Sequence, residues 1–309
     1  MMPAMARQPP VRSPYRLPPR RPRPRRSLGG AVAGILGVVA AILVFAVLGL
    51  ATFMENGGVT VGLGGRAPEV KRETATHNPL YRTGRLTPVG CRLPGIEAGV
   101  DSSMERFMET LSRCLDRSWG RQFDKAELAF DAPKRIFWNT PGRGPCGSFP
   151  NPGAAAFYCP ENNTMYVGLR HIVETSGGEP VSHYAVYARV IAHEYGHHVQ
   201  ERAGILAYGH RRMDTASVAA RTEASRRIEL QAQCLAGLFL GAERSTLPMT
   251  RRQYEAMMVD VRGRGDEKQP AHRRDHGSGH HYAGWVEKGY RDPSVGVCDT
   301  WSVPAADVD

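Results

Sequence analysis

Residues 190–200 read VIAHEYGHHVQ, and within them His193, Glu194 and His197 form the pattern H-E-x-x-H. Apolar residues precede the pattern at helical spacing, which predicts a helix over about 183–201. Positions four apart in an α-helix lie about 40° from each other, so both imidazoles can reach one ion. The pattern is typical of two zinc ligands with the intervening glutamate as general base.

A catalytic zinc ion usually has three protein ligands, so the sequence must supply one more. A third histidine at the metzincin spacing would occupy position 203, which is Ala203, and that subclass is therefore excluded. The remaining source is a carboxylate from a following helix, and Glu229 stands between apolar residues in a helix predicted over about 214–240. Spacing alone leaves three rivals open: Glu201, Asp214 and Glu223.

Several segments of the chain resemble the bacterial family called putative neutral zinc metallopeptidases. They are VIAHEYGHHVQ, RRIELQAQCLAG at 226–237, HGSG at 276–279, CDTW at 298–301 and, upstream, CG at 146–147 with FYCPENNTMYV at 157–167. The resemblance covers about residues 95–302. It implies a zincin-like peptidase of gluzincin type, with one Zn2+ per chain, a peptide or protein substrate, and Glu229 as the third ligand.

One position departs from the family's pattern. The family's segment reads E-L-Q-A-D-C, whereas this chain has Gln233 in place of the acid. Gln233 follows Glu229 by one helical turn, where the resemblance implies a group that orients a ligand histidine by accepting its free N–H. A glutamine accepts this bond without charge, which predicts weaker metal binding or activity. Two alternatives to a peptidase stay open: a catalytically impaired zinc-binding surface module, and a zinc amidase acting on cell-wall peptides.

The oxyanion that forms during peptide hydrolysis needs a further hydrogen-bond donor. His276 matches the family's HG-S segment and is the candidate, with Tyr282, His280 and His281 as alternatives. This histidine-rich stretch is also compatible with a solvated loop. Upstream, residues 164–169 read as a strand that either pairs along its edge with an extended peptide or lies in the core.

The folded domain is predicted over 96–305 and belongs to the α+β class, because short strand signals precede long helical ones. Helix caps near Asp101 predict the first helix. Strands are expected at 136–138 and 164–169, with a turn at 160–163 after Phe157 and Tyr158, and the last helix is expected at about 250–262.

All six cysteines lie after the apolar run described below. Sequence proximity favours the pairs Cys91–Cys114 and Cys146–Cys159, which leaves Cys234–Cys298 as the third pair. The resemblance also implies counterparts for Cys146, Cys159, Cys234 and Cys298. Free buried thiols remain the alternative.

Residues 31–53 form a run of 23 residues without a charged side chain. As a helix this run would span about 34 Å, enough to cross a hydrocarbon core of about 30 Å. A buried helix rarely stays apolar on every face for this length, and a signal peptide has a shorter core and a small-x-small cleavage site. We therefore expect a single transmembrane anchor in the lipid bilayer.

The net charge of +10 arises mainly at the N-terminus. Residues 1–30 contain eight arginines and no acid, whereas the rest of the chain has 32 Lys and Arg against 30 Asp and Glu. An Arg/Pro-rich tail beside the anchor predicts a cytoplasmic N-terminus at the cell membrane. The domain then follows a Gly/Pro-rich stalk at 54–95 and lies outside the cytoplasm, where disulfides persist. No nucleic-acid partner is expected, since the domain has no strong basic bias.

Overall fold

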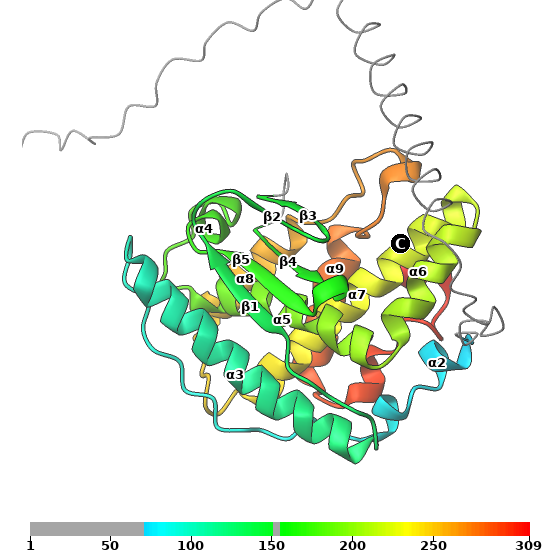
Figure 1. Cartoon of the computed structure of the whole chain (residues 1–309), viewed down its shortest axis with the longest axis horizontal. Coiled ribbons are helices and arrows are strands. Elements are labelled where there is room, and N and C mark those ends of the chain that lie inside the picture. The colour runs from blue at the N-terminus through cyan, green and yellow to red at the C-terminus, as the bar shows by residue number, and fades with distance from the viewer. Residues whose placement is uncertain (1–70, 151–154) are drawn as a thin grey trace, which may run out of the picture. The chain divides into compact units, whose positions relative to one another are not determined.

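The computed structural model describes residues 71–150 and 155–309, in which a small sheet packs beside long helices (Figure 1). This confirms the prediction of a mainly helical domain with a small sheet. The helices are α2 (Glu73–Thr76), α3 (Asp101–Lys125), α4 (His171–Thr175), α5 (Tyr184–Arg202), α6 (Ile205–Thr215), α7 (Val218–Ala242), α8 (Arg251–Arg262) and α9 (Gly279–Arg291). The strands are β1 (Lys134–Trp138), β2 (Gly142–Gly144), β3 (Gly147–Phe149), β4 (Ala156–Cys159) and β5 (Thr164–Gly168). Short 3-10 helices are η1 (Pro79–Arg82), η2 (Pro160–Asn162), η3 (Ala271–Arg273), η4 (Val295–Cys298) and η5 (Ala305–Val308).

Strand β5 lies in the middle of a three-stranded sheet of order β1-β5-β4. β1 runs parallel to it and β4 antiparallel, so that Tyr166 has Ile136 on one side and Phe157 on the other. Every residue of β5 is buried. Residues 164–169 were expected to form either an edge strand that pairs with a peptide or a core strand, and in the structure they form the core strand β5. The two outer edges of this sheet, which no described strand pairs, belong to β1 and β4.

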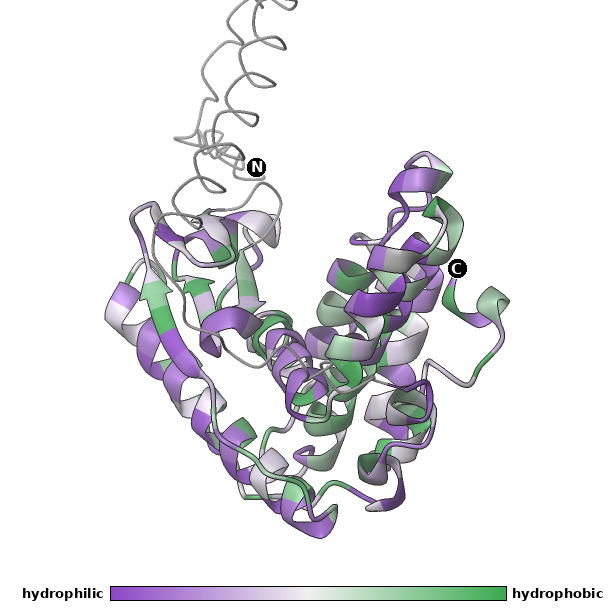
Figure 2. Cartoon of the chain, turned by 45° about the vertical axis from the view of Figure 1, so that its right-hand side comes forward, coloured by the Kyte–Doolittle hydropathy of each residue, from purple (hydrophilic) through white to green (hydrophobic). Residues whose placement is uncertain are grey.

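Helix α5 forms the centre of the helical part of the domain. Helices α3, α7 and α8 and strand β4 pack around it, so buried side chains occupy all of its faces. Figure 2 shows hydrophobic residues gathered where these helices meet. A helix buried on every side is held in place by its neighbours rather than by one apolar stripe, and this makes it a rigid support for functional side chains.

Two of the longer helices, α6 and α9, were not expected from the sequence. Helix α6 follows α5 after Gly204, whose positive φ of 74° turns the chain. Helix α9 begins in the stretch that was compatible with a solvated loop, and the Ser278 side chain caps it by accepting the N–H of His281. Its buried residues Tyr282, Trp285 and Val286 follow helical spacing. The surrounding glycines and histidines obscured this signal.

The segment 71–95 differs from the predicted stalk, because it packs on the domain. The side chains of Leu80 and Leu86 are 1% and 2% exposed. The buried carboxylate of Glu243 accepts hydrogen bonds from the backbone N–H groups of Val89 and Cys91. The buried residues of segment 71–95 are isolated between prolines and follow neither a helical nor a strand period, so nothing in the sequence indicated that this segment packs on the domain.

The structure pairs all six cysteines as proximity favoured: Cys91–Cys114, Cys146–Cys159 and Cys234–Cys298. The predicted tail, anchor and first part of the stalk, at 1–30, 31–53 and 54–70, lie outside the described residues. Within residues 71–150 and 155–309, no helix has the length and apolar character needed to cross a bilayer.

Candidate metal centre

Helices α5 and α7 approach closely at Gly196. A Cβ atom there would lie 3.0 Å from both the Cα and the carbonyl oxygen of Ala232 on α7. Glycine in a helix interior costs about 1 kcal/mol relative to alanine, and close approach of the two backbones explains its presence here. Glu229 lies one turn before Ala232, and the crossing therefore brings its carboxylate to the face of α5 that presents the two histidines.

Three predicted ligand groups meet at this crossing. The Nε2 atom of His193 lies 3.3 Å from Oε2 of Glu229, and Nε2 of His197 lies 3.6 Å from Oε1. Zinc bonds of about 2.0–2.2 Å at tetrahedral angles separate ligand atoms by about 3.3–3.6 Å. The three residues thus fit one zinc ion. The rival Glu223 instead forms an ion pair with Arg227.

The protonation states of these residues suit a cation. Burial lowers the pKa of His193 to about 4, which favours the neutral imidazole that a metal requires. Burial alone would raise the pKa of Glu229, but His197 and His193 more than offset this and lower it, so the carboxylate is ionised.

Glu194 lies beside this group and is buried. Its Oε2 accepts a hydrogen bond of 3.1 Å from the backbone N–H of Tyr158 on β4, which leaves Oε1 for another partner. Burial raises the pKa of Glu194 to about 7, against the opposing effects of His197 and of the Tyr158 N–H. The bond also ties the edge strand to α5.

A chain of side-chain amides orients His197, and sequence reasoning missed it. The Nδ1 of His197 lies 3.0 Å from Oε1 of Gln200, whose Nε2 donates to the carbonyl of Ile228 and to the side chain of Gln231. Because the Gln200 nitrogen is the donor there, its oxygen accepts the Nδ1–H of His197. The lone pair of Nε2 then faces Glu229. The signal was available, since Gln200 follows His197 by three residues on the same helix.

Gln233, predicted to orient a ligand histidine, does not do so in the structure. Its amide is fully buried beside Tyr282 and makes no hydrogen bond to His193 or His197. The Nδ1 of His193 has no hydrogen-bond partner among the described residues. Of the two candidate ligand histidines, a glutamine among the described residues orients His197 and not His193.

His276 and Tyr282 line the same cleft as the ligand group, which has a volume of about 630 Å³. The ring of Tyr282 lies 6.3 Å from the rings of both His193 and His276. The Nδ1 of His276 is 2.6 Å from Oδ1 of Asp275. Burial would lower the pKa of His276, but Glu229 and Asp275 raise it, which favours the charged imidazolium.

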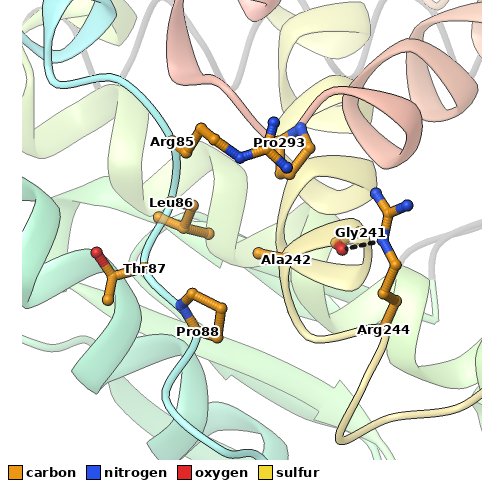
Figure 3. Close-up of a pocket in the computed structure, with 8 residues that line it drawn as sticks. All are labelled: Arg85, Leu86, Thr87, Pro88, Gly241, Ala242, Arg244 and Pro293. Carbon is orange, nitrogen blue, oxygen red and sulfur yellow. Dashed lines mark hydrogen bonds between the residues drawn. The ribbon is translucent and has the colours of Figure 1, made fainter.

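The alternatives His280 and His281 do not line the cleft. The ring of His281 is hydrogen-bonded to the backbone carbonyl of Asp309. A separate hollow of about 540 Å³ lies near the end of α7, where Arg244 donates to the Gly241 carbonyl (Figure 3). It contains no group of histidines or acids comparable to the cleft.

A family model described as "Putative neutral zinc metallopeptidase" matches residues 92–301, more than half of the chain. The chain belongs to this family. The match contains both helices of the candidate centre. A zinc metallopeptidase family implies a zinc-dependent hydrolase that acts on peptides or proteins.

The curated relatives of this family member are themselves uncharacterized. The protein YpfJ of Escherichia coli K12 is 26% identical over 204 residues, which are 63% of this chain and 71% of the relative. The protein Rv2575 of Mycobacterium tuberculosis H37Rv is 31% identical over 192 residues, 54% of this chain and 60% of the relative. No solved structure matches the chain.

Proposed function

We propose that the chain is a membrane-anchored zinc metallopeptidase that hydrolyses peptide bonds outside the cytoplasm. The observation that carries the proposal is the meeting of His193, His197 and Glu229 at zinc-compatible distances, with Glu194 beside them in an open cleft. One zinc ion per chain would be held by these three ligands. A retained Glu194 favours an active enzyme over an impaired module.

Zinc, when bound, supplies Lewis-acid activation of water and of the scissile carbonyl. Glu194 accepts the proton of the attacking water on the carboxylate oxygen that Tyr158 does not engage, and later delivers it to the leaving amine. The Tyr158 N–H fixes the carboxylate in this position. Gln200 keeps His197 in the tautomer that presents Nε2.

His276 and Tyr282 would stabilise the oxyanion. Both line the cleft, and both present a donor: Asp275 holds Nδ1 of His276, so the other ring nitrogen is left for substrate. The Tyr282 hydroxyl stays protonated, because burial raises its pKa. Such a preorganised donor is worth about 10²–10³-fold in rate.

The free edge of β4 would align the substrate. Ala155, Ala156, Phe157 and Tyr158 line the cleft. The Tyr158 N–H points to Glu194, away from β5, so the backbone groups of Ala156 face the same side. An extended peptide pairing with this edge would lie across the ligand group.

The membrane anchor rests on the sequence of residues 1–53, an arginine-rich tail followed by 23 uncharged residues. Three disulfides fit an oxidising compartment outside the cytoplasm. Protease treatment of intact cells or spheroplasts should digest the domain, as it digests a known external control. Full protection of the domain would refute this topology.

Zinc content and hydrolysis test the activity. The full chain, purified in detergent, should contain about one zinc per chain and cleave a broad peptide library, whereas Glu194→Gln should keep the zinc and cleave nothing. Cell-wall peptides form a second substrate set, and cleavage of these alone would establish the amidase. Wild-type protein that holds zinc and cleaves neither set would establish the impaired module.

A further inference from the structure

Two arginines share a single acid in the wall of the cleft. Arg189 lies one turn before His193 on α5, and Arg264 follows α8 directly. The carboxylate of Asp260 on α8 accepts a hydrogen bond from Nη2 of Arg189. It also accepts hydrogen bonds of 2.9 Å each from Nε and Nη2 of Arg264. Both arginines line the cleft. The cluster therefore belongs to the cleft wall as well as to the core.

The charges in this cluster do not balance. Arginine is charged at any ordinary pH, and Asp260 is ionised, because the two guanidinium groups lower its pKa despite its burial. No other acid among the described residues forms an ion pair with Arg189 or Arg264. Glu194 interacts electrostatically with both arginines but forms its hydrogen bond with the Tyr158 N–H, so it pairs directly with neither. Arg189, Arg264 and Asp260 by themselves therefore carry one net positive charge.

The cluster also has unused hydrogen-bond donors. Arg189 is 2% exposed, and its buried Nε has no hydrogen-bond partner within the described residues. The Nη1 of Arg264 likewise has no acceptor among the described residues, and the Arg264 side chain is 24% exposed. A buried donor without a partner is costly unless a ligand supplies the acceptor.

We propose that Arg189 and Arg264 form a subsite for a carboxylate of the peptide substrate, close to the bond that is cleaved. The proposal rests on the peptidase function and names its substrate class. A guanidinium group offers a planar pair of donors that matches a carboxylate. One helical turn is about 5.4 Å and an extended residue about 3.3 Å, so the carboxylate lies within about two residues of the scissile bond.

The carboxylate belongs either to an acidic side chain of the peptide or to its C-terminus, and binding measurements separate these two sources. Zinc-loaded full-length Glu194→Gln protein would be titrated with fluorescent peptides that carry one Glu, or Gln in its place, at successive positions. A second peptide pair would end in a free carboxylate or in an amide. We expect roughly tenfold or tighter binding of the charged member of one pair, as for other charge-assisted hydrogen bonds.

Arg264→Gln in the same background should remove most of this preference, and Arg264→Lys should restore part of it. Arg262→Gln is the matched control, because it removes an exposed arginine two residues earlier, outside the cleft lining. Zinc content and thermal unfolding would verify that each variant is folded. Equal binding of both members in every pair, or an unchanged preference in Arg264→Gln, would overturn the subsite.

The binding assay needs no turnover, so its result is separate from the peptidase function. If wild-type protein cleaves no peptide but the charge preference persists, the peptidase function fails and the carboxylate site stands. If wild-type cleaves peptides with no preference for a nearby carboxylate in either binding or kcat/KM, the subsite fails alone.

Discussion

The two halves of α5 are held by different kinds of polar contact. Around His197, neutral amides of Gln200 and Gln231 pass hydrogen bonds to Tyr81 and to the backbone of α7 and η4. Around His193, one turn earlier, the contacts are charged, and Asp260 is shared by two arginines. The first network satisfies its donors and acceptors, whereas the second leaves donors facing the cleft.

The neutral network supports the orientation of His197, whereas the charged cluster is suited to recognise an anionic ligand. A satisfied neutral network fixes a tautomer and a ring orientation, and has nothing left to offer a ligand. A charged cluster with a surplus donor is costly in isolation and becomes favourable when an anion arrives. The two halves of one helix therefore have separate tasks in the same site.

The largest effect is expected where the two halves meet, at Glu229. Glu229→Ala removes the carboxylate that faces both imidazoles, and two histidines leave a three-ligand site incomplete. We expect loss of most zinc and a fall in hydrolysis beyond the about 10–100-fold that outer partners cost. Glu223→Ala, on the same helix, is the control. Full zinc in Glu229→Ala and loss in Glu223→Ala would reverse the ligand assignment.

Breaking the charged half should cost stability. Asp260→Asn leaves two buried guanidinium groups without their acid, which we expect to cost about 3–5 kcal/mol in urea unfolding at pH 7. Because the folded pKa of Asp260 is lowered, its contribution is complete above its unfolded value of about 4 and is lost as pH falls further. The gap between wild type and variant should shrink below about pH 4. A gap independent of pH would contradict this account.

Breaking the neutral half should affect the metal more than the fold. Gln200→Ala removes the acceptor of the His197 Nδ1–H, and chelator competition should show zinc binding weaker by about 10–100-fold. Gln200→Glu keeps an acceptor and should retain most of the affinity. Unchanged zinc binding in Gln200→Ala would show that the amide network does not hold the ligand.

The smallest effect is expected at Gln233. Its amide makes no hydrogen bond to His193 or His197 and lies beside the Tyr282 hydroxyl, and Gln233→Met removes these buried polar atoms at similar volume. Stability should stay equal or rise by up to about 1 kcal/mol, with zinc affinity within about threefold of wild type. A loss of zinc as large as in Gln200→Ala would instead show that position 233 orients His193.

The two histidines proposed as ligands and the glutamate proposed as base were predictable because they depend on short-range geometry. His193, Glu194 and His197 follow from the period of one helix, and every large helix except α6 and α9 had a readable apolar pattern. Glu229 required the family resemblance, since spacing alone left three rivals. The zinc-compatible distances among these residues agree with that expectation, and binding itself stays a prediction.

The rest of the site depends on tertiary packing. Tyr158 and Arg264 come from elements far from α5 in sequence, and no local period connects a strand N–H with Glu194 or an arginine after α8 with Arg189. The choice between a core strand and an edge strand for 164–169 also depended on where β1 and β4 pair. Segment 71–95 packs through isolated side chains, which carry no pattern at all.

The contact between Gly196 and Ala232 has a consequence for metal selectivity. The distance between the imidazoles of α5 and the carboxylate of α7 is set by two backbones in contact, and the ligands themselves have little freedom to adjust it. A methyl group at position 196 would have to move Ala232 by a few tenths of an ångström. The space between the ligands would then suit an ion of larger radius than zinc. The helix crossing thus sets the spacing of the three candidate ligands, and we expect this spacing to contribute to the choice of ion by its size.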